Sequence, residues 1–390
     1  MRKLKELLEI KPFWRIEAAA SRLLSKHFRE YLWLCAFVLQ FIDTFRLGVK
    51  SGCGFFAAPP TAYWVGTLLI LLAVTYFLCG YSWKELICIS LVLAVFGLSY
   101  LMTGDAALFR LAVFIFSARG IPFDRICKFG FWSFLTGLVI VVTLSFFGVT
   151  EDVVIVRSEL VGRGAIRHSL GFRNPNGLGL CLTLLIAARL TYTYKKLRIA
   201  DYIVWLAATA ACFIVTNSKL SLMLNVLILV GAMISKHVNG KKLSKLLLIC
   251  IPCIAAAWML LIFAYDSDSK LLYAINVLTS DRVNLARLAY DDFGVTLLGQ
   301  RISFPLPVDS TFASIPVKNG LAAFICLILL TGYSVKKAYQ SGRPELMILL
   351  AGYVLYAVME TSTSAVPFSF ALIALAADLG SGSADKAALK

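Results

Sequence analysis

The chain has few charged residues for its length. Asp, Glu, Lys and Arg make up 15% of its 390 residues, whereas about 25% is usual in a soluble domain. Apolar residues make up 59%, which is more than one water-soluble core can bury. This composition argues against a soluble enzyme, a disordered chain and a secreted disulfide scaffold. The apolar residues come in long runs, which indicates membrane spans.

The sequence also lacks a recognisable metal or redox motif. Cys250 and Cys253 have a CxxC spacing, but they lie inside an apolar run, where cysteines are expected to be small helix residues. Asp291 and Asp292 are adjacent carboxylates, but no third ligand follows at a recognisable spacing. We therefore expect no metal and no cofactor.

Hydropathy predicts an all-α, polytopic integral membrane protein with about 12 transmembrane helices, each near 20 residues or somewhat shorter. No strand-like alternation competes with this pattern. The approximate limits of the expected spans are 31–46, 63–81, 86–103, 105–118, 130–149, 174–194, 199–217, 220–235, 246–265, 316–335, 345–360 and 365–379.

The basic residues set the expected orientation. The formal net charge is +16, which in a soluble protein would be typical of nucleic-acid binding. If the N-terminus is cytoplasmic, most of the 38 Lys and Arg residues fall in cytoplasmic segments, as the positive-inside rule requires. We therefore expect a multi-pass protein of the cytoplasmic membrane with both termini cytoplasmic, and no nucleic-acid partner.

The expected spans divide the chain into three parts. Residues 1–30 form a basic cytoplasmic segment without the short apolar region of a cleavable signal. Residues 31–380 form the membrane catalytic domain, and 381–390 a cytoplasmic tail. Two outer loops, about 150–173 and 266–315, are longer than ordinary connections. Helix-like apolar spacing in the second loop predicts a partly helical extracytoplasmic loop cap.

The first outer loop ends in a helix start with phosphate-binding character. Asn174 can cap a helix, and Pro175 suits its first position. Arg167, His168 and Arg173 lie just before it. A helix N-terminus beside guanidinium groups is a good phosphate site. The simpler reading is a capped helix with arginines that bind lipid headgroups.

Residues 167–179, Arg-His-Ser-Leu-Gly-Phe-Arg-Asn-Pro-Asn-Gly-Leu-Gly, resemble a motif of Wzy-type capsular and O-antigen polysaccharide polymerases. The family pattern is Arg-(aromatic or His)-Ser-Leu-Gly-Phe-x-His-Pro-Asn-x-x-Gly. These proteins are multi-span membrane glycosyltransferases related to the O-antigen ligases. Weaker matches follow in the family's order, over roughly 150–325: Ser218-Lys219, Arg282, Leu298-Gly299, Asp309-Ser310-Thr311-Phe312 and Gly320.

Three positions depart from the family pattern. Asn174 replaces the usual His before Pro-Asn, so any basic role of that position fails in this chain. Lys219 replaces an Arg and loses the bidentate fork. Ser310 replaces an Asn. The interpretation that departs least from the family is a related sugar-transfer reaction in which these three positions contact the substrate differently.

The resemblance implies a polymerase that joins polyprenyl-diphosphate-linked oligosaccharide repeats at the outer face of the membrane, in capsule, exopolysaccharide or O-antigen biosynthesis. Arg282 and Arg287 are five residues apart, about 140° around a helix, so they cannot easily face one ligand, and Arg282 carries the family match. The expected catalytic residues are Arg167, His168, Arg282 and Asp309. The expected substrate-binding residues are Arg173, Asn174, Asn176, Lys219 and Arg287.

Two other functions remain open at the level of sequence. An O-antigen-ligase-like transferase of finished polymer would share fold and chemistry. A flippase or transporter of lipid-linked oligosaccharides is suggested by charges in or at the ends of spans, at Asp43, Asp105, Arg110 and Glu360. Such charges should face the bundle interior or pair, for example Asp105 with Arg110. Besides lipid-linked oligosaccharides and the bilayer, the expected partners are a flippase and a chain-length regulator.

Overall fold

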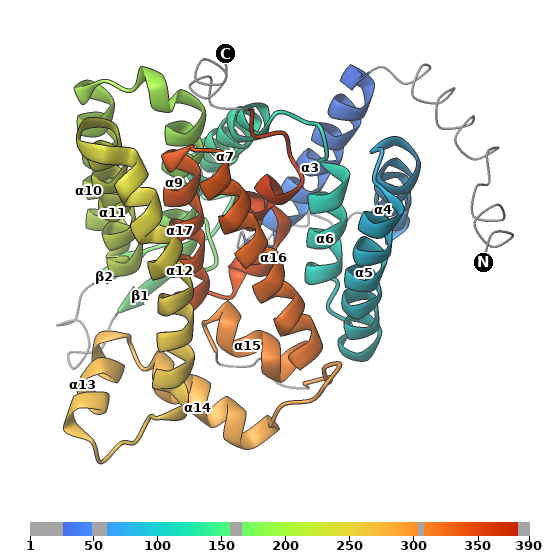
Figure 1. Ribbon diagram of the computed structural model, residues 1–390. Coiled ribbons are helices and arrows are strands. Elements are labelled where there is room, and N and C mark those ends of the chain that lie inside the picture. Colours follow the sequence, from blue (N-terminus) through green and yellow to red (C-terminus); the bar gives the residue numbers. More distant parts are fainter. Residues whose placement is uncertain (1–25, 49–60, 157–165, 303–307, 381–390) are drawn as a thin grey trace, which may run out of the picture.

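The computed structural model describes residues 26–48, 61–156, 166–302 and 308–380. Within these ranges the protein is all-α except for one small sheet (Figure 1). Strands β1 (Val154–Val156) and β2 (Ile166–His168) pair antiparallel. The expected all-α class is thus confirmed. The segments 1–25 and 381–390, which hold most of the basic N-terminal segment and the whole tail, lie outside the described residues.

The first half of the bundle contains five helical segments. They are α3 (Lys26–Gly48), α4 (Thr61–Ala73) continued by the π-helical turn η2 (Val74–Leu78), α5 (Trp83–Thr103), α6 (Ala107–Ser117) and α7 (Phe123–Phe146). After the sheet come α9 (Pro175–Thr193) with η3 (Tyr194–Lys196), α10 (Ile199–Thr216), α11 (Lys219–Ile234) with η4 (Ser235–Asn239), and α12 (Gly240–Phe263).

A cap and three further segments complete the chain. The cap consists of α13 (Lys270–Leu278), α14 (Arg282–Phe293) and α15 (Thr311–Lys318). It is followed by α16 (Leu321–Gln340), α17 (Pro344–Met359), η5 (Ser362–Ser364) and η6 (Val366–Leu375). The cap covers one end of the bundle (Figure 1). The partly helical character expected for residues 266–315 is confirmed.

Seven described helices are long and apolar enough to cross a membrane: α5, α7, α9, α10, α11, α12 and α16. These helices indicate a membrane protein. Helical segments overlap each of the expected spans, but four are shorter than 18 residues. Helix α6, for example, has 11 residues and is about 16 Å long, against a hydrocarbon core of about 30 Å. Twelve spans are therefore not confirmed.

Successive apolar helices run in opposite directions, so the bundle has two ends. The start of α9 and the end of α17 lie at the end that the cap covers, here named the motif end (Figure 1). Asn174 precedes α9 and Glu360 follows α17 at this end. Lys195 and Arg343 lie at the opposite, basic end. The alternation follows from the short turns between neighbouring helices. It brings residues from distant parts of the sequence together under the cap.

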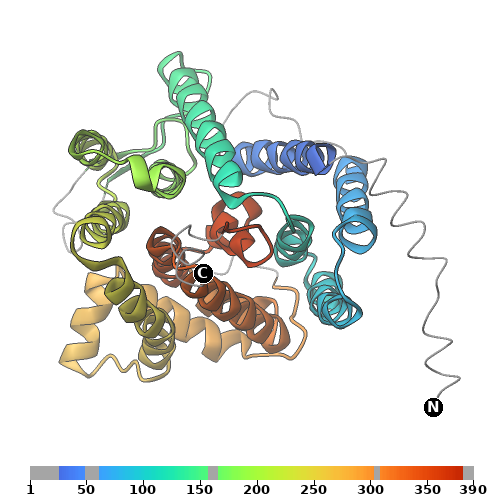
Figure 2. The same cartoon turned by 45° about the horizontal axis from the view of Figure 1, so that its top comes forward.

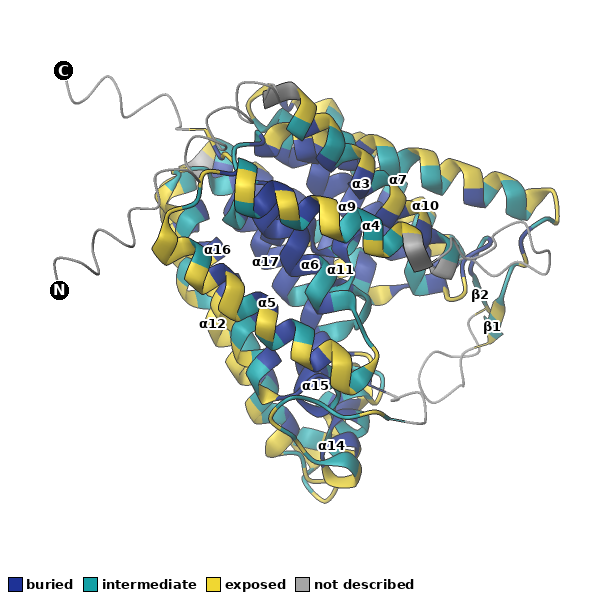
Figure 3. Ribbon diagram, turned by 90° about the vertical axis from the view of Figure 1, so that its right-hand side faces the viewer, coloured by how far each residue is buried: buried dark blue, intermediate teal, exposed yellow. Residues whose placement is uncertain are grey.

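Helices α9 and α17 form the interior of the bundle, whereas α10 and α12 are peripheral (Figure 2). In α9, 67% of the apolar span is buried, against 11% in α10 and 17% in α12. The peripheral helices expose large apolar side chains such as Ile214 and Leu260 (Figure 3). This distribution suits a bundle in lipid, since outward-facing apolar side chains have no water to avoid there.

Charged groups in the bundle are paired, as expected, but the pairing of Asp105 with Arg110 is wrong. Lys318 Nζ lies 2.6 Å from Asp105 Oδ2, and Arg110 lies 3.5 Å from Asp43. Asp105 precedes the first residue of α6, Ala107, and so binds the start of the helix rather than a side chain one turn further along. The carboxylate of Asp105 accepts from the Ala107 N–H and turns toward α15 instead.

The CxxC pair lies within a helix, as expected. Cys250 and Cys253 are free thiols within α12.

Candidate functional site

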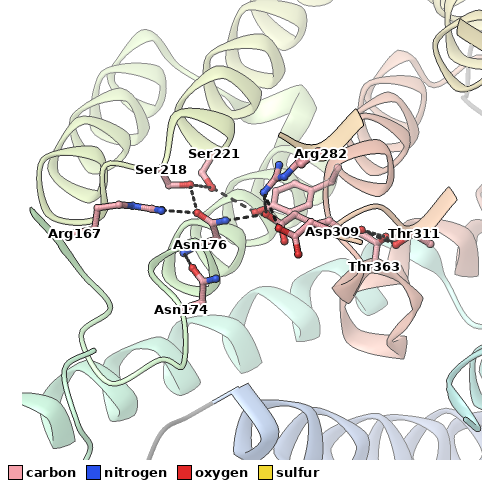
Figure 4. A network of polar contacts seen from close by, with 11 residues as sticks. Arg167, Asn174, Asn176, Ser218, Ser221, Arg282, Asp309, Thr311 and Thr363 are labelled. Atoms are coloured by element: carbon pink, nitrogen blue, oxygen red, sulfur yellow. Dashed lines mark hydrogen bonds and ion pairs between the residues drawn. The ribbon is translucent and has the colours of Figure 1, made fainter. Parts of the chain in front are cut away.

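A chain of polar contacts lies at the motif end and joins Arg167 and Arg282, which come from two segments far apart in the sequence. It runs from Arg167 through Asn176 and Glu360 to Arg282 (Figure 4). Four segments that are far apart in the sequence supply these side chains: β2, α9, the end of α17 and the start of α14. The convergence of Arg167 and Arg282 on one network makes this cluster, here named the Arg167–Arg282 site, the candidate functional site.

Arg167 is held by the end of α10 and the start of α9. Its Nε donates to the Thr216 carbonyl at 2.8 Å, and its Nη2 donates to Asn176 Oδ1 at 2.7 Å. The carbonyl of Thr216 is available because α10 ends there: Asn217 adopts a left-handed conformation with φ 46°. Strand pairing of Arg167 with Ile155 fixes the backbone from which the side chain projects.

The expected helix start is confirmed at Asn174. Its side chain caps α9 by accepting from the Asn176 N–H at 2.9 Å, and Pro175 occupies the first turn. The Asn174 N-cap fixes the first turn of α9 and so places the Asn176 side-chain amide at the start of this central helix. Asn176 accepts from Arg167 and Ser218 and donates through Nδ2 to Glu360 Oε1 at 3.0 Å.

Arg282 sits between two carboxylates of different exposure. Its Nη2 lies 2.9 Å from Glu360 Oε1 and 3.7 Å from Asp309 Oδ2. The Arg282 and Glu360 side chains are 12% and 15% exposed, whereas Asp309 is 59% exposed. Asp309 is thus the carboxylate of this site that an entering molecule meets first.

Glu360 follows the last residue of α17 and sits in an unusual electrostatic setting. Burial raises the pKa of its carboxyl from 4.5 to about 7, and the charge of Asp309 adds to this effect, whereas Arg282 and the Asn176 amide oppose it. A carboxyl with a pKa near neutrality exchanges protons readily at physiological pH.

His168 lies outside this network. Neighbouring side chains of a strand point to opposite faces, so His168 points away from the side that Arg167 takes. Its Nδ1 lies 2.7 Å from Asp152 Oδ2. The other oxygen of Asp152 accepts from the Ser169 and Leu170 N–H groups. The geometry favours a turn-holding role over the expected catalytic one.

Three expected substrate-binding residues lie at the margins of the site. Arg173 and Lys219 are exposed. Arg287 points elsewhere: its Nε lies 3.0 Å from Asp291 Oδ2, and its Nη1 donates to the Phe263 carbonyl. Arg282 and Arg287 thus contact different partners.

Several residues of the site were missed in the sequence. Glu360 was noted only as a charge at the end of a span. Ser218 contacts Ser221 at 3.1 Å, and Ser221 contacts the Tyr356 hydroxyl at 3.4 Å. Thr311 donates to the Glu360 carbonyl at 2.6 Å. No sequence spacing marks these hydroxyls, because their partners are set by the packing of α9, α11 and α17.

The two matched glycines, Gly299 and Gly320, lie against each other beside α15. Both have positive φ, 100° and 93°. A Cβ on Gly320 would lie 2.6 Å from the Leu297 carbonyl oxygen, and one on Gly299 would lie 2.7 Å from that of Lys318. Only glycine tolerates this combination of conformation and close backbone approach. The pair fastens the loop after α14 to the start of α16 and so positions the cap.

Within the described ranges, no three His, Cys, Asp or Glu side chains are grouped so that they could hold a metal ion. Asp291 is instead engaged by Arg287.

No family model, curated protein or solved structure matches the chain.

Proposed function

We propose that this protein is a membrane polysaccharide polymerase of the Wzy type, which joins polyprenyl-diphosphate-linked oligosaccharide repeats at the outer face of the cytoplasmic membrane. The observation that carries the proposal is the convergence of Arg167 and Arg282 on one polar network under the cap. Both arginines match arginines of the family motif, and they come from separate loops.

In the proposed reaction, a hydroxyl oxygen of one lipid-linked repeat attacks the anomeric carbon of the donor sugar. The bond from that carbon to the diphosphate oxygen breaks, and polyprenyl diphosphate leaves with the electron pair. Negative charge grows on the leaving group, so fixed guanidinium groups lower the barrier without a metal. Arg167 and Arg282 have this role, since both reach the network from the capped end of the bundle.

The hydroxyl proton needs an acceptor, and Glu360 suits this role better than Asp309. Its pKa of about 7 is close to the pH of the surroundings, where a general base works best. A diphosphate that binds Arg282 also competes with Glu360 for the guanidinium, which favours protonation of the carboxyl. The more exposed Asp309 is assigned a hydrogen bond to a sugar hydroxyl.

The proposal includes the orientation and the span number expected from the sequence. The motif end faces outward, and the basic end and both termini face the cytoplasm. In addition to the seven long helices, α3, α4 with η2, α6, α17 and η6 complete about twelve crossings, the shorter ones as tilted or broken spans. Exposed apolar side chains on peripheral helices suit two lipid-borne substrates that enter from the bilayer. Flippase and chain-length regulator are proposed partners in the same pathway.

The decisive experiment is reconstitution in detergent, without membrane compartments. Purified protein receives lipid-linked oligosaccharide extracted from source cells that lack this gene, with EDTA present. A polymerase yields a ladder of lipid-linked products and one released polyprenyl diphosphate for each bond formed. Absence of any new glycosidic bond, with transport of the same lipid in proteoliposomes, would contradict the proposal in favour of a flippase. Single transfer to a different acceptor would indicate a ligase.

A further inference from the structure

A second group of arginines lies at the motif end, on elements that the Arg167–Arg282 site does not use. Arg46, in the last turn of α3, lies 3.1 Å from Asp43 Oδ1. Arg110, in the first turns of α6, lies 3.5 Å from Asp43 Oδ2. The guanidinium carbon of Arg110 also lies 5.1 Å from the centre of the Trp64 ring on α4.

This group carries an uncompensated positive charge. Two guanidinium groups share one carboxylate, and the nearby Asp105 is already paired with Lys318. The Nε atoms of Arg46 and Arg110 are buried and have no hydrogen-bond partner. A buried N–H donor without a hydrogen-bond partner destabilises the fold. An ion pair with Asp43 alone does not explain why two such donors lie at one place. A bound anion would satisfy both.

The position of the group suits a membrane lipid. The side chains of Arg46 and Arg110 are 19% and 25% exposed, so an anion can reach them. On the same turns of α3 and α4, Ile42 and Tyr63 are 55% and 61% exposed. These apolar surfaces can accommodate a hydrocarbon chain beside the charged head.

An aromatic packing contact connects this group of arginines with the Arg167–Arg282 site. Phe45, between Asp43 and Arg46 in α3, packs edge-on against Phe172, with ring centroids 6.0 Å apart. Phe172 lies in the motif segment that leads from Arg167 into α9. The two arginine groups therefore flank one packed aromatic contact at the same end of the bundle.

We infer that Arg46 and Arg110 form a second phosphate-binding site, which takes the phosphate or diphosphate head of a lipid. Asp43 occupies the two guanidinium groups when no lipid is bound and competes with the phosphate for them, and the Trp64 ring packs against the Arg110 guanidinium. The assignment of this lipid to the second, acceptor-bearing polyprenyl diphosphate rests on the proposed function. A phospholipid of the bilayer presents the same phosphate chemistry, and the test below separates the two sources.

The test counts and titrates bound lipids on the intact detergent-solubilised protein by native mass spectrometry, so it needs no enzymatic activity. The probes are undecaprenyl diphosphate and phosphatidylglycerol. The variant Asp43→Asn/Arg46→Gln/Arg110→Gln removes the site without leaving a buried charge unpaired. The matched control is Arg189→Gln, which removes an arginine stacked on Tyr192 and Phe131 near the basic end.

Wild-type protein is expected to bind two molecules of undecaprenyl diphosphate. The triple variant should bind one, and Arg167→Gln/Arg282→Gln should also bind one, each with at least about tenfold weaker affinity at the altered site. If the triple variant loses phosphatidylglycerol but not undecaprenyl diphosphate, the phosphate site is supported and its source is the bilayer. If it keeps both lipids with unchanged affinity, the inference is wrong.

Asp43→Asn alone provides an outcome that misfolding cannot imitate. Removal of the competing carboxylate leaves both guanidinium groups to the phosphate, so lipid binding should tighten, by about tenfold. A purely structural ion-pair role predicts weaker or unchanged binding, and either result overturns the inference. These outcomes are independent of polymer formation, so a failure of the proposed function would be seen separately in the reconstitution.

Discussion

Asn176 donates to Glu360 across 3.0 Å and thereby joins the start of α9 to the end of α17. The same Glu360 oxygen accepts from Arg282 at 2.9 Å. One oxygen of the largely buried Glu360 carboxyl group thus accepts from both Asn176 and Arg282, and the protonation state of this group decides how strongly Arg282 is held.

Glu360 gives the site a predicted pH dependence. If its ionised form accepts the hydroxyl proton, kcat/KM should rise with pH and reach half its maximum near pH 7, because burial raises the pKa of Glu360 to about 7. Glu360→Gln should remove this rising limb and lower the rate by about a hundredfold or more. Initial rates of polymer formation between pH 5 and 9 measure the effect. Asp309→Asn is the control: it should keep the rise of kcat/KM with pH, shifted to lower pH because the charge of Asp309 helps to raise the pKa of Glu360. An unchanged profile in Glu360→Gln would exclude Glu360 as the base.

The same carboxyl should make stability depend on pH. Because its folded pKa is raised, the folded protein holds a proton that the unfolded chain releases above about pH 4.5. The free energy of unfolding should therefore fall as pH rises from about 4.5 to about 7, by about 3 kcal/mol. Thermal unfolding of wild type and Glu360→Gln in detergent tests this, and Glu360→Gln should show the smaller fall. Equal slopes in the two proteins would argue against a raised pKa.

Gly179 should be intolerant of a side chain. It lies where α9 meets α11, and a Cβ there would lie 2.8 Å from Ser221 Cβ. Gly179→Ala should destabilise the fold by about 1–3 kcal/mol, because a tightly packed helix contact cannot absorb an added methyl. Gly332→Ala in α16 is the matched control, since nothing lies within 4 Å of its added Cβ. The measurement is the melting temperature of both variants, which should be lower for Gly179→Ala. Equal melting temperatures would show that α9 and α11 can move apart enough to accept the methyl group.

The proposed orientation predicts a labelling pattern. In a background without the ten native cysteines, Leu278→Cys should react with an impermeant maleimide added outside intact cells, because Leu278 is 82% exposed in the cap. Lys241→Cys, exposed at the basic end, should react only after the membrane is opened. The reverse pattern would place the Arg167–Arg282 site on the cytoplasmic side.

Local signals in the sequence predicted the helices, the cap and the Asn174-Pro175 helix start. Apolar run length predicts where a helix forms, but not whether a short one such as α6 crosses the bilayer alone. The role of Arg167 as part of the site was within reach, because it belongs to a contiguous motif with Asn176.

Other contacts were out of reach because they depend on packing. Glu360 meets Asn176 across 184 positions through the burial of α9 and α17 against each other, which no spacing records. The pairing of Asp43 with Arg110 likewise depends on how α3 lies beside α6. Strand alternation turns His168 away from its neighbour Arg167, and no alternation in the sequence predicted a strand there.

The most direct test of the account is the rate of polymer formation by Arg167→Ala and Arg282→Ala, with purified protein, lipid-linked repeats and matched membrane levels. If both guanidinium groups stabilise one leaving diphosphate, each loss should cost about 1.5–3 kcal/mol, or about tenfold to a hundredfold in rate. Arg167→Lys should be nearly as harmful, since the planar fork is lost. Arg301→Ala, which removes an exposed arginine, should stay near wild type. Wild-type rates in both Arg167→Ala and Arg282→Ala would contradict the account.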